Sequence, residues 1–196
     1  MKVWSTEHVY EHPWQTVVNA AYRKYPNPMN GSVTGMDIVQ QNVDNGVLKT
    51  ERILQSQFHV PAWAARLTGF SGVQYSREYT EIDPTRRQMV LNTRNLNCSS
   101  FLHVDERLIY SPSQSDPSKT QLKQEVAVSV NLPAFTDYCE KMFLTTYANN
   151  AMKGRNGLEW VIDQLKREYN EISSKVTSEV HGFSSKFLNS KANTSR

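Results

Sequence analysis

The sequence contains little of what would place it in several common classes of protein. Only two of its 196 residues are cysteines, Cys98 and Cys139, and neither has a second Cys or a His at metal-ligand spacing. No window approaches the roughly 18 apolar residues that a membrane-spanning helix needs. The formal net charge of +3 is far from the dense basic stripe of a nucleic-acid-binding protein. We therefore expect a soluble protein with two buried, unbridged thiols.

Signals for catalysis and for secretion are also missing. No glycine-rich loop precedes a helix, no serine lies in a nucleophile elbow, and neither cysteine has a nearby group to activate it. His103 and Asp105 share one face of a strand, and a solvent-facing strand surface explains them better than a metal or acid–base pair. Residues 1–10 alternate apolar and polar residues, unlike a secretory signal or a mitochondrial presequence. We expect no enzyme activity, no cofactor, no metal and no cleavable presequence.

What the sequence does contain is a series of alternating segments rich in Val, Ile, Thr and Tyr, separated by turn signals. One of these signals, Asp44-Asn45-Gly46, is typical of a tight hairpin. Alternation of this kind predicts an antiparallel sheet with one covered and one solvent-facing side. The predicted strands lie near 2–10, 32–44, 47–58, 72–83, 86–96, 100–110 and 120–131.

Helical periodicity appears before and after these strands. Pro13 begins a short helix with one apolar face. A long helical region begins at Pro133 and has a weak point at Gly154 and Gly157. Together the pieces predict an α+β domain over 1–172, in which a curved seven-stranded antiparallel sheet grips the long C-terminal helix, and a frayed helix with a disordered tail over 173–196.

The segment from Val60 to Phe70 is too long and too apolar for an ordinary hairpin loop. Trp63, Leu67 and Phe70 follow one another at helical spacing, which predicts a short amphipathic helix. Such a helix could contact a membrane, because Trp favours the interface between water and lipid. It could instead plug one end of the sheet, and composition alone favours the plug.

Basic residues form a second candidate site. Lys24 ends the first helix, and Lys153 and Arg155 flank Gly154 in the long helical region. Brought together, two such cations could hold a phosphate group. Taken alone, they are more simply interpreted as solvated surface charges.

Particular segments resemble a known family along most of the chain. They are Met1-Lys2-Val3-Trp4, Glu7-His8-Val9, His12-Pro13-Trp14, Lys24 to Asn30, Val104 to Tyr110, Lys153-Gly154-Arg155 and Glu159 to Ile162. In this order they resemble the PRELI/MSF1 family, and its slowmo branch in particular. The similarity runs from residue 1 into the long helical region, so coincidence is a poor explanation of it.

The resemblance implies a phospholipid-transfer protein of the mitochondrial intermembrane space, with a pocket for two acyl chains between sheet and helix. It also implies a partner, a small helical protein with twin Cys-x9-Cys motifs. The head-group-binding residues that it implies are Lys24, Asn150 and Lys153. The lid and membrane-contact residues that it implies are Val60, Pro61, Trp63, Leu67 and Phe70.

The sequence departs from the phosphatidic-acid branch of the family at three positions. Basic or imidazole groups of that branch align here with Ser32 and Ser56, and another basic position aligns near Thr146. Hydroxyl groups suit a head group with its own ammonium and carboxylate, and the slowmo branch is associated with phosphatidylserine. We therefore expect phosphatidylserine to be carried between the outer and inner mitochondrial membranes, with peripheral contact to anionic lipid. The alternative is a non-transporting scaffold or adaptor that acts through the small partner.

Overall fold

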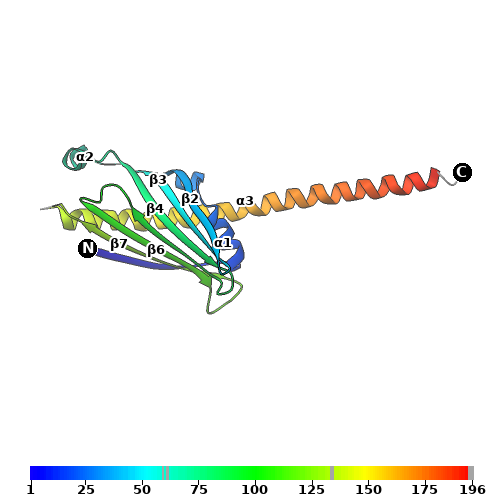
Figure 1. The fold of residues 1–196 in the computed structure, drawn as a ribbon, viewed down its shortest axis with the longest axis horizontal. Coiled ribbons are helices and arrows are strands. Elements are labelled where there is room, and N and C mark those ends of the chain that lie inside the picture. The colour runs from blue at the N-terminus through cyan, green and yellow to red at the C-terminus, as the bar shows by residue number, and fades with distance from the viewer. Residues whose placement is uncertain (59, 61, 133–134, 194–196) are drawn as a thin grey trace.

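The fold is a single antiparallel sheet with a long helix lying across it, as seen in a computed structural model (Figure 1). The structure describes residues 1–58, 60, 62–132 and 135–193, with the backbone alone at 64, 67 and 181–193. The strands are β1 (Lys2–Tyr10), β2 (Val33–Asp44), β3 (Val47–Gln57), β4 (Val73–Asp83), β5 (Gln88–Asn95), β6 (Leu102–Pro112) and β7 (Thr120–Val130). The helices are α1 (Trp14–Tyr22), the short 3-10 helix η1 (Pro28–Asn30), α2 (Ala62–Thr68) and α3 (Thr136–Asn193).

The seven predicted strands are confirmed, and so is the tight hairpin between the second and third of them. The strand order in the sheet is β1-β7-β6-β5-β4-β3-β2, so the chain forms a meander from β2 to β7 and β1 joins beside β7. All neighbours are antiparallel. At the hairpin, Asn45 has φ 50° and Gly46 has φ 80°, a backbone conformation that Asn and Gly tolerate better than other residues.

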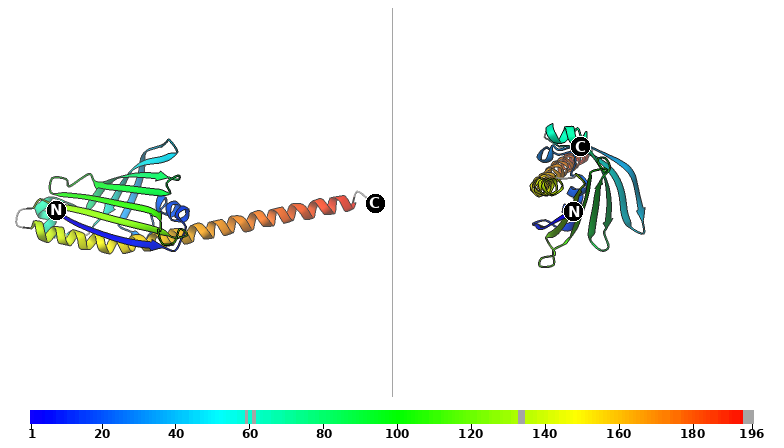
Figure 2. Two further views of the ribbon diagram at one scale, coloured as in Figure 1. Left: turned by 90° about the horizontal axis from the view of Figure 1, so that it is seen from below. Right: turned by 90° about the vertical axis from the view of Figure 1, so that its left-hand side faces the viewer.

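The sheet curves around the first half of α3, and α1 closes one end of the concave face (Figure 2). Two apolar clusters lie between the layers. The first cluster joins α1 to the sheet and the middle of α3, and its fully buried members include Tyr10, Val17, Met89, Leu158 and Ile162. The second cluster packs the start of α3 on β6 and β7, and its members include Leu102, Val104, Val126, Val128 and Cys139.

Helix α3 is continuous through Gly154 and Gly157, so these glycines do not interrupt it. Its side chains from 166 to 180 are exposed, because this part of the helix extends beyond the sheet (Figure 1). Fraying and disorder in 173–196 stay a prediction.

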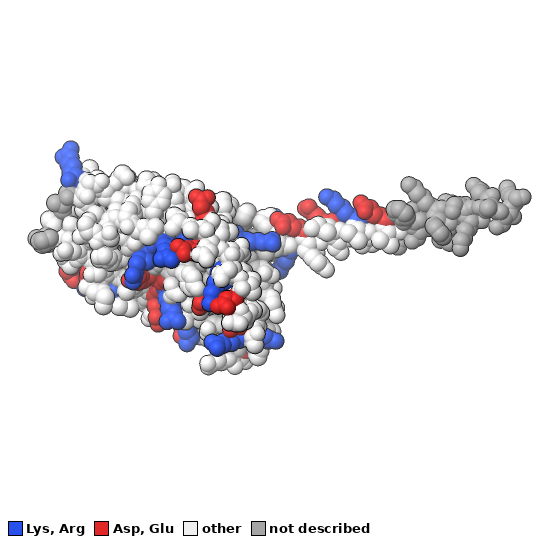
Figure 3. All heavy atoms as spheres, in the orientation of Figure 1, with Lys and Arg blue, Asp and Glu red and all other residues white. Residues whose placement is uncertain are grey.

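Within the described ranges, no helix combines the length and hydropathy needed to cross a bilayer. Acidic and basic side chains are interspersed over the outer face of the sheet (Figure 3).

Two details differ from the sequence-based predictions. The first helix ends at Tyr22, so Lys24 lies in the turn after it rather than at its end. Both cysteines are free, as expected, but only Cys139 is buried, whereas Cys98 is half-buried in the turn between β5 and β6.

Candidate ligand-binding pocket

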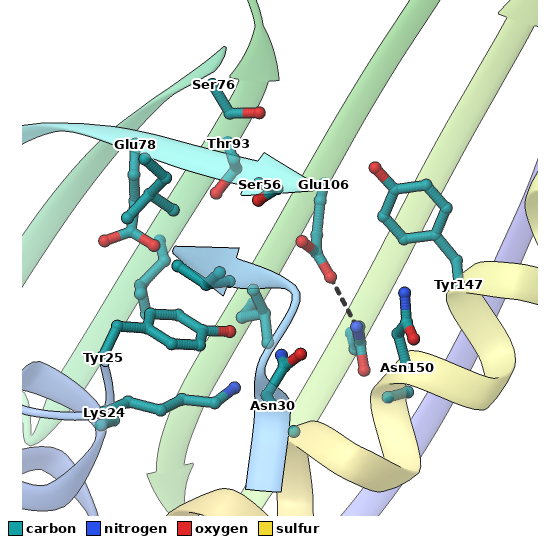
Figure 4. Close-up of a pocket in the computed structure, with 18 of the residues that line it drawn as sticks. Lys24, Tyr25, Asn30, Ser56, Ser76, Glu78, Thr93, Glu106, Tyr147 and Asn150 are labelled. Carbon is teal, nitrogen blue, oxygen red and sulfur yellow. Dashed lines mark hydrogen bonds between the residues drawn. The ribbon is translucent and has the colours of Figure 1, made fainter. Parts of the chain in front are cut away.

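A pocket lies between the concave face of the sheet and α3, next to the turn that joins α1 to β2 (Figure 4). Its volume is about 130 Å³. An apolar cavity of about 150 Å³ admits a molecule the size of benzene, so this pocket fits part of a lipid head group and not two acyl chains. This pocket does not provide the room for two acyl chains that the resemblance implies. The second apolar cluster packs the start of α3 on β6 and β7 with the protein's own side chains.

Lys24 reaches into the pocket from the turn after α1, and its amine points toward Asn30 (Figure 4). The Nζ atom lies 5.1 Å from the centre of the Tyr25 ring. A Cβ atom at Gly154 would lie 3.0 Å from this Nζ, so the glycine gives the lysine its place beside α3. In the part of the chain that the structure describes, Lys24 forms no ion pair with a carboxylate, and its partner is the Tyr25 side chain, so its charge can meet that of an anion.

The second glycine of α3 has a similar role. A Cβ atom at Gly157 would lie 2.9 Å from Oδ1 of Asn27, so only glycine lets the turn approach the helix this closely. The same Oδ1 accepts a hydrogen bond from the backbone N–H of Asn30 at 3.0 Å, which holds the turn in shape. The glycines that appeared as a weak point in the sequence are therefore contact points for the segment that carries Lys24.

Two of the three predicted head-group residues, Lys24 and Asn150, line the pocket, as do Ser32 and Ser56. Lys153 does not, and its side chain is exposed. With about 100° per residue, the lining positions 147, 150, 151, 154 and 155 share one face of α3, and Lys153 points about 120° away from it. The structure therefore does not bring Lys153 into the pocket beside Lys24.

Arg155 supplies the cation on this part of α3 instead. It lines the pocket, and its Nη2 donates to the Thr6 hydroxyl on β1 at 3.1 Å. Its Nε is buried and has no hydrogen-bond partner among the described residues. Sequence reasoning grouped Arg155 with Lys153 as a flanking charge, although the helical period separates the two.

Arg52 on β3 is a further pocket cation that sequence reasoning missed. It is only 3% exposed, and its guanidinium lies 3.9 Å from the centre of the Tyr22 ring. Nη1 donates to the Tyr22 carbonyl oxygen at 3.0 Å. Nε and Nη2 are buried without a hydrogen-bond partner in the described part of the protein. Unpaired donors on a buried charged group are costly, so this side chain favours an anionic ligand.

Two carboxyl groups also point into the pocket, from Glu78 on β4 and Glu106 on β6 (Figure 4). Burial raises the pKa of Glu78, and the charges of Arg52 and Lys24 offset this only in part. Burial likewise raises the pKa of Glu106, against a hydrogen bond from the Gln124 amide at 2.6 Å and the charge of Lys24. The pocket therefore carries groups of both signs, and neither carboxyl was predicted as a site residue.

The predicted lid helix is confirmed as α2, which follows the end of β3 where Phe58 lines the pocket. Trp63 is 42% exposed, and its ring lies 5.6 Å from the Phe135 ring and 6.5 Å from the Tyr138 ring.

Val60 and Phe70 are half-buried. Pro61 and the side chain of Leu67 lie outside the described residues. The lid role of this segment stays a prediction, and the cluster of Trp63, Phe135 and Tyr138 adds two exposed aromatic residues that the sequence did not indicate.

The structure agrees with the prediction that His103 and Asp105 lie on a solvent-facing strand surface. His103 and Asp105 are exposed there, and Asp105 forms an ion pair with Arg94. Among the described residues, no group of three or more His, Cys, Asp or Glu side chains is arranged to hold a metal ion.

The fold and the pocket together define a helix-grip protein with a small internal site of cations and carboxyls. The chain belongs to the PRELI-like family, whose model matches residues 15–168. It is 31% identical over 167 residues to Protein slowmo homolog of Dictyostelium discoideum, with 84% of this chain and 73% of that protein covered. It is 26% identical over 190 residues to Protein UPS2, mitochondrial, of Saccharomyces cerevisiae, with 92% and 83% covered.

Solved structures share the fold at low sequence identity. TTHA0849 from Thermus thermophilus superposes with a TM-score of 0.58 at 13% identity, over 84% of this chain and 99% of that one. A START superfamily protein from Mycobacterium smegmatis gives 0.53 at 16% identity, over 83% and 98%. The predicted helix-grip architecture is thereby confirmed, and the function has to be argued from the site.

Proposed function

We propose that the chain is a non-enzymatic phospholipid-transfer protein that carries phosphatidylserine between the outer and inner mitochondrial membranes. The single observation that carries this proposal is the internal pocket, in which Lys24 forms no ion pair with a carboxylate and Arg52 keeps two unpaired N–H groups, within the described residues of a PRELI-like chain. Pocket cations of this kind suit a phosphate group that has been removed from water.

A carrier is needed because the acyl chains cannot cross water unaided. About 30 methylenes at about 0.8 kcal/mol each correspond to a cost on the order of 20 kcal/mol for a diacyl lipid exposed to water. The pocket seats the head group, while the acyl chains require more room than about 130 Å³. We infer that they displace the start of α3 from β6 and β7, where the second apolar cluster offers an apolar lining once it is opened.

Membrane contact is assigned to the end of the molecule that carries α2. Trp63, Phe135 and Tyr138 form an exposed aromatic cluster there, which suits the interface between water and lipid. Val60, Pro61, Leu67 and Phe70 belong to the same proposed lid. The net charge of +3 aids peripheral contact with anionic lipid, at about 1 kcal/mol for each cation near the surface.

The proposed location is the intermembrane space, and the proposed partner is a small helical protein with twin Cys-x9-Cys motifs. The name of the yeast relative, Protein UPS2, mitochondrial, supports the organelle. The partner rests on the family resemblance alone.

The small pocket also favours a second candidate, a non-transporting scaffold or adaptor acting through that partner. In this case the second apolar cluster would stay closed, and the sheet would be filled permanently by the chain's own side chains. Native mass spectrometry of the chain expressed with its partner separates the two candidates, because an adaptor would carry no co-purified lipid.

Transfer between vesicles tests the proposed function. Donor vesicles contain fluorescently labelled phosphatidylserine in phosphatidylcholine, and acceptor vesicles contain phosphatidylcholine alone. We expect transfer to rise with the concentration of the full chain. A transfer rate equal to that without protein would refute the proposal.

A further inference from the structure

The two carboxyl groups of the pocket are unexpected in a site for an anionic phosphate. Glu78 is 5% exposed, and Glu106, which is half-buried, lies on the covered face of β6. Figure 4 shows both carboxyl groups extending from the strands into the space above Lys24. A site built only for phosphate would gain nothing from them, because like charges in a pocket repel.

The protein leaves both carboxyl groups incompletely paired. Glu78 and Arg52 are 3.8 Å apart at their nearest atoms, which is longer than a charge-assisted hydrogen bond. The Thr80 hydroxyl donates to Glu78 at 3.4 Å, and the Gln124 amide donates to Glu106. Since an ionised carboxylate can accept about four hydrogen bonds, each group keeps capacity for a donor from a ligand.

The cationic and anionic groups of the pocket come from several elements. Lys24 and Arg155 approach from the side of α1 and α3, whereas the two carboxyls come from β4 and β6. Arg52 on β3 lies opposite Glu78, at 3.8 Å, so Glu106 is the carboxyl that has no ion pair among the described residues. The charge of Lys24 lowers the pKa of each carboxyl, against the larger effect of burial, which raises it. A ligand with one negative and one positive group is the chemical complement of this arrangement.

Resting on the proposed function, we propose that Glu78 and Glu106 form an ammonium subsite. The pocket then selects glycerophospholipids whose head group carries a primary ammonium as well as a phosphate, with the phosphate facing Lys24. A lipid without the ammonium leaves the two carboxyls of the pocket without this partner, beside its own negative charge, so it binds more weakly.

The first test changes the ligand and leaves the protein intact. The full chain is assayed with phosphatidylserine, phosphatidylethanolamine, N-acetyl-phosphatidylserine and phosphatidic acid, each as a minor component of phosphatidylcholine vesicles. We expect the two lipids with an ammonium to move faster than the other two by about tenfold or more. Equal rates for phosphatidylserine and its N-acetyl form would overturn the subsite, as would a phosphatidylethanolamine rate no higher than that of the N-acetyl form.

The second test changes the carboxyls. Glu78→Gln and Glu106→Gln keep the size of each side chain and remove its charge, and thermal unfolding identifies any variant that fails to fold. Either variant should reduce the rate ratio of phosphatidylserine to N-acetyl-phosphatidylserine toward one. Glu125→Gln on β7 is the matched control, because this carboxyl is exposed, and it should leave the ratio unchanged.

The outcomes separate the two proposals. No transfer of any lipid by the unmodified chain would refute the transfer function itself. If folded Glu78→Gln and Glu106→Gln transfer lipid with an unchanged rate ratio of phosphatidylserine to N-acetyl-phosphatidylserine, only the ammonium subsite is refuted.

Discussion

The two parts of the concave face differ in what fills them. At the α1 end, side chains such as Val17, Leu158 and Ile162 are completely buried in an apolar cluster. In the pocket, Arg52 and Arg155 keep buried N–H groups that no other described residue accepts. Apolar packing of this kind stabilises the fold, whereas unpaired buried charge does not. The comparison teaches that the α1 end supplies stability and that the pocket is kept polar for a ligand.

The largest expected effect is on stability, from a cavity at the α1 end. Leu158→Ala should lower the free energy of unfolding by about 3 kcal/mol, because Leu158 is fully buried. Urea denaturation measures this change. Lys166→Ala, on the exposed part of the same helix, is the control and should change stability little. A loss below about 1 kcal/mol for Leu158→Ala would contradict the claim that the α1 end supplies stability.

Replacing Lys24 in the pocket should reduce transfer without reducing stability. Lys24→Met keeps the length of the side chain and removes its charge, so stability should be unchanged or higher. Transfer of phosphatidylserine should fall about a hundredfold, equivalent to about 2.7 kcal/mol of lost head-group binding. Vesicle transfer and urea denaturation on the same sample measure both quantities. Normal transfer by a folded Lys24→Met variant would contradict the head-group assignment.

A smaller effect is expected at the aromatic cluster of the lid. Trp63→Ala should slow transfer about fivefold, roughly 1 kcal/mol, through weaker contact with the membrane. Tyr75→Ala is a matched control, because Tyr75 on β4 is also 42% exposed but is not part of the cluster. Equal slowing by the two substitutions would show that exposed aromatic area in general, and not this cluster, governs the rate.

The smallest effect is expected at Lys153. Lys153→Ala should change the transfer rate by less than about twofold, because this side chain is exposed and points away from the pocket. Transfer assays of Lys24→Met and Lys153→Ala side by side compare a cation that lines the pocket with an exposed one. A large loss in Lys153→Ala would restore the sequence-based pairing of the two lysines.

Much of the fold could be predicted from the sequence, because its signals are local. Alternation of apolar and polar residues indicated the strands, and Asp44-Asn45-Gly46 marked a hairpin that the structure confirms. The roles of Gly154 and Gly157 could not be predicted in the same way. They depend on contacts with Lys24 and Asn27, which are far away in the sequence.

The site was only partly predictable. Lys24 and Asn150 were expected through the family resemblance, whereas Arg52, Glu78 and Glu106 were missed. A signal for Glu106 was nevertheless present, because it follows Leu102 and Val104 at every second position and so falls on the covered face of β6. A charged residue in register with buried apolar positions is a sequence indication of an internal polar site.

The most direct test of the account is native mass spectrometry of the full chain after incubation with phosphatidylserine vesicles. We predict a complex of one phospholipid per unmodified chain, and a much smaller fraction of complex for folded Lys24→Met. A chain that acquires no lipid, or a Lys24→Met variant that retains lipid as well as the unmodified chain, would contradict the claim that this pocket holds a phospholipid head group.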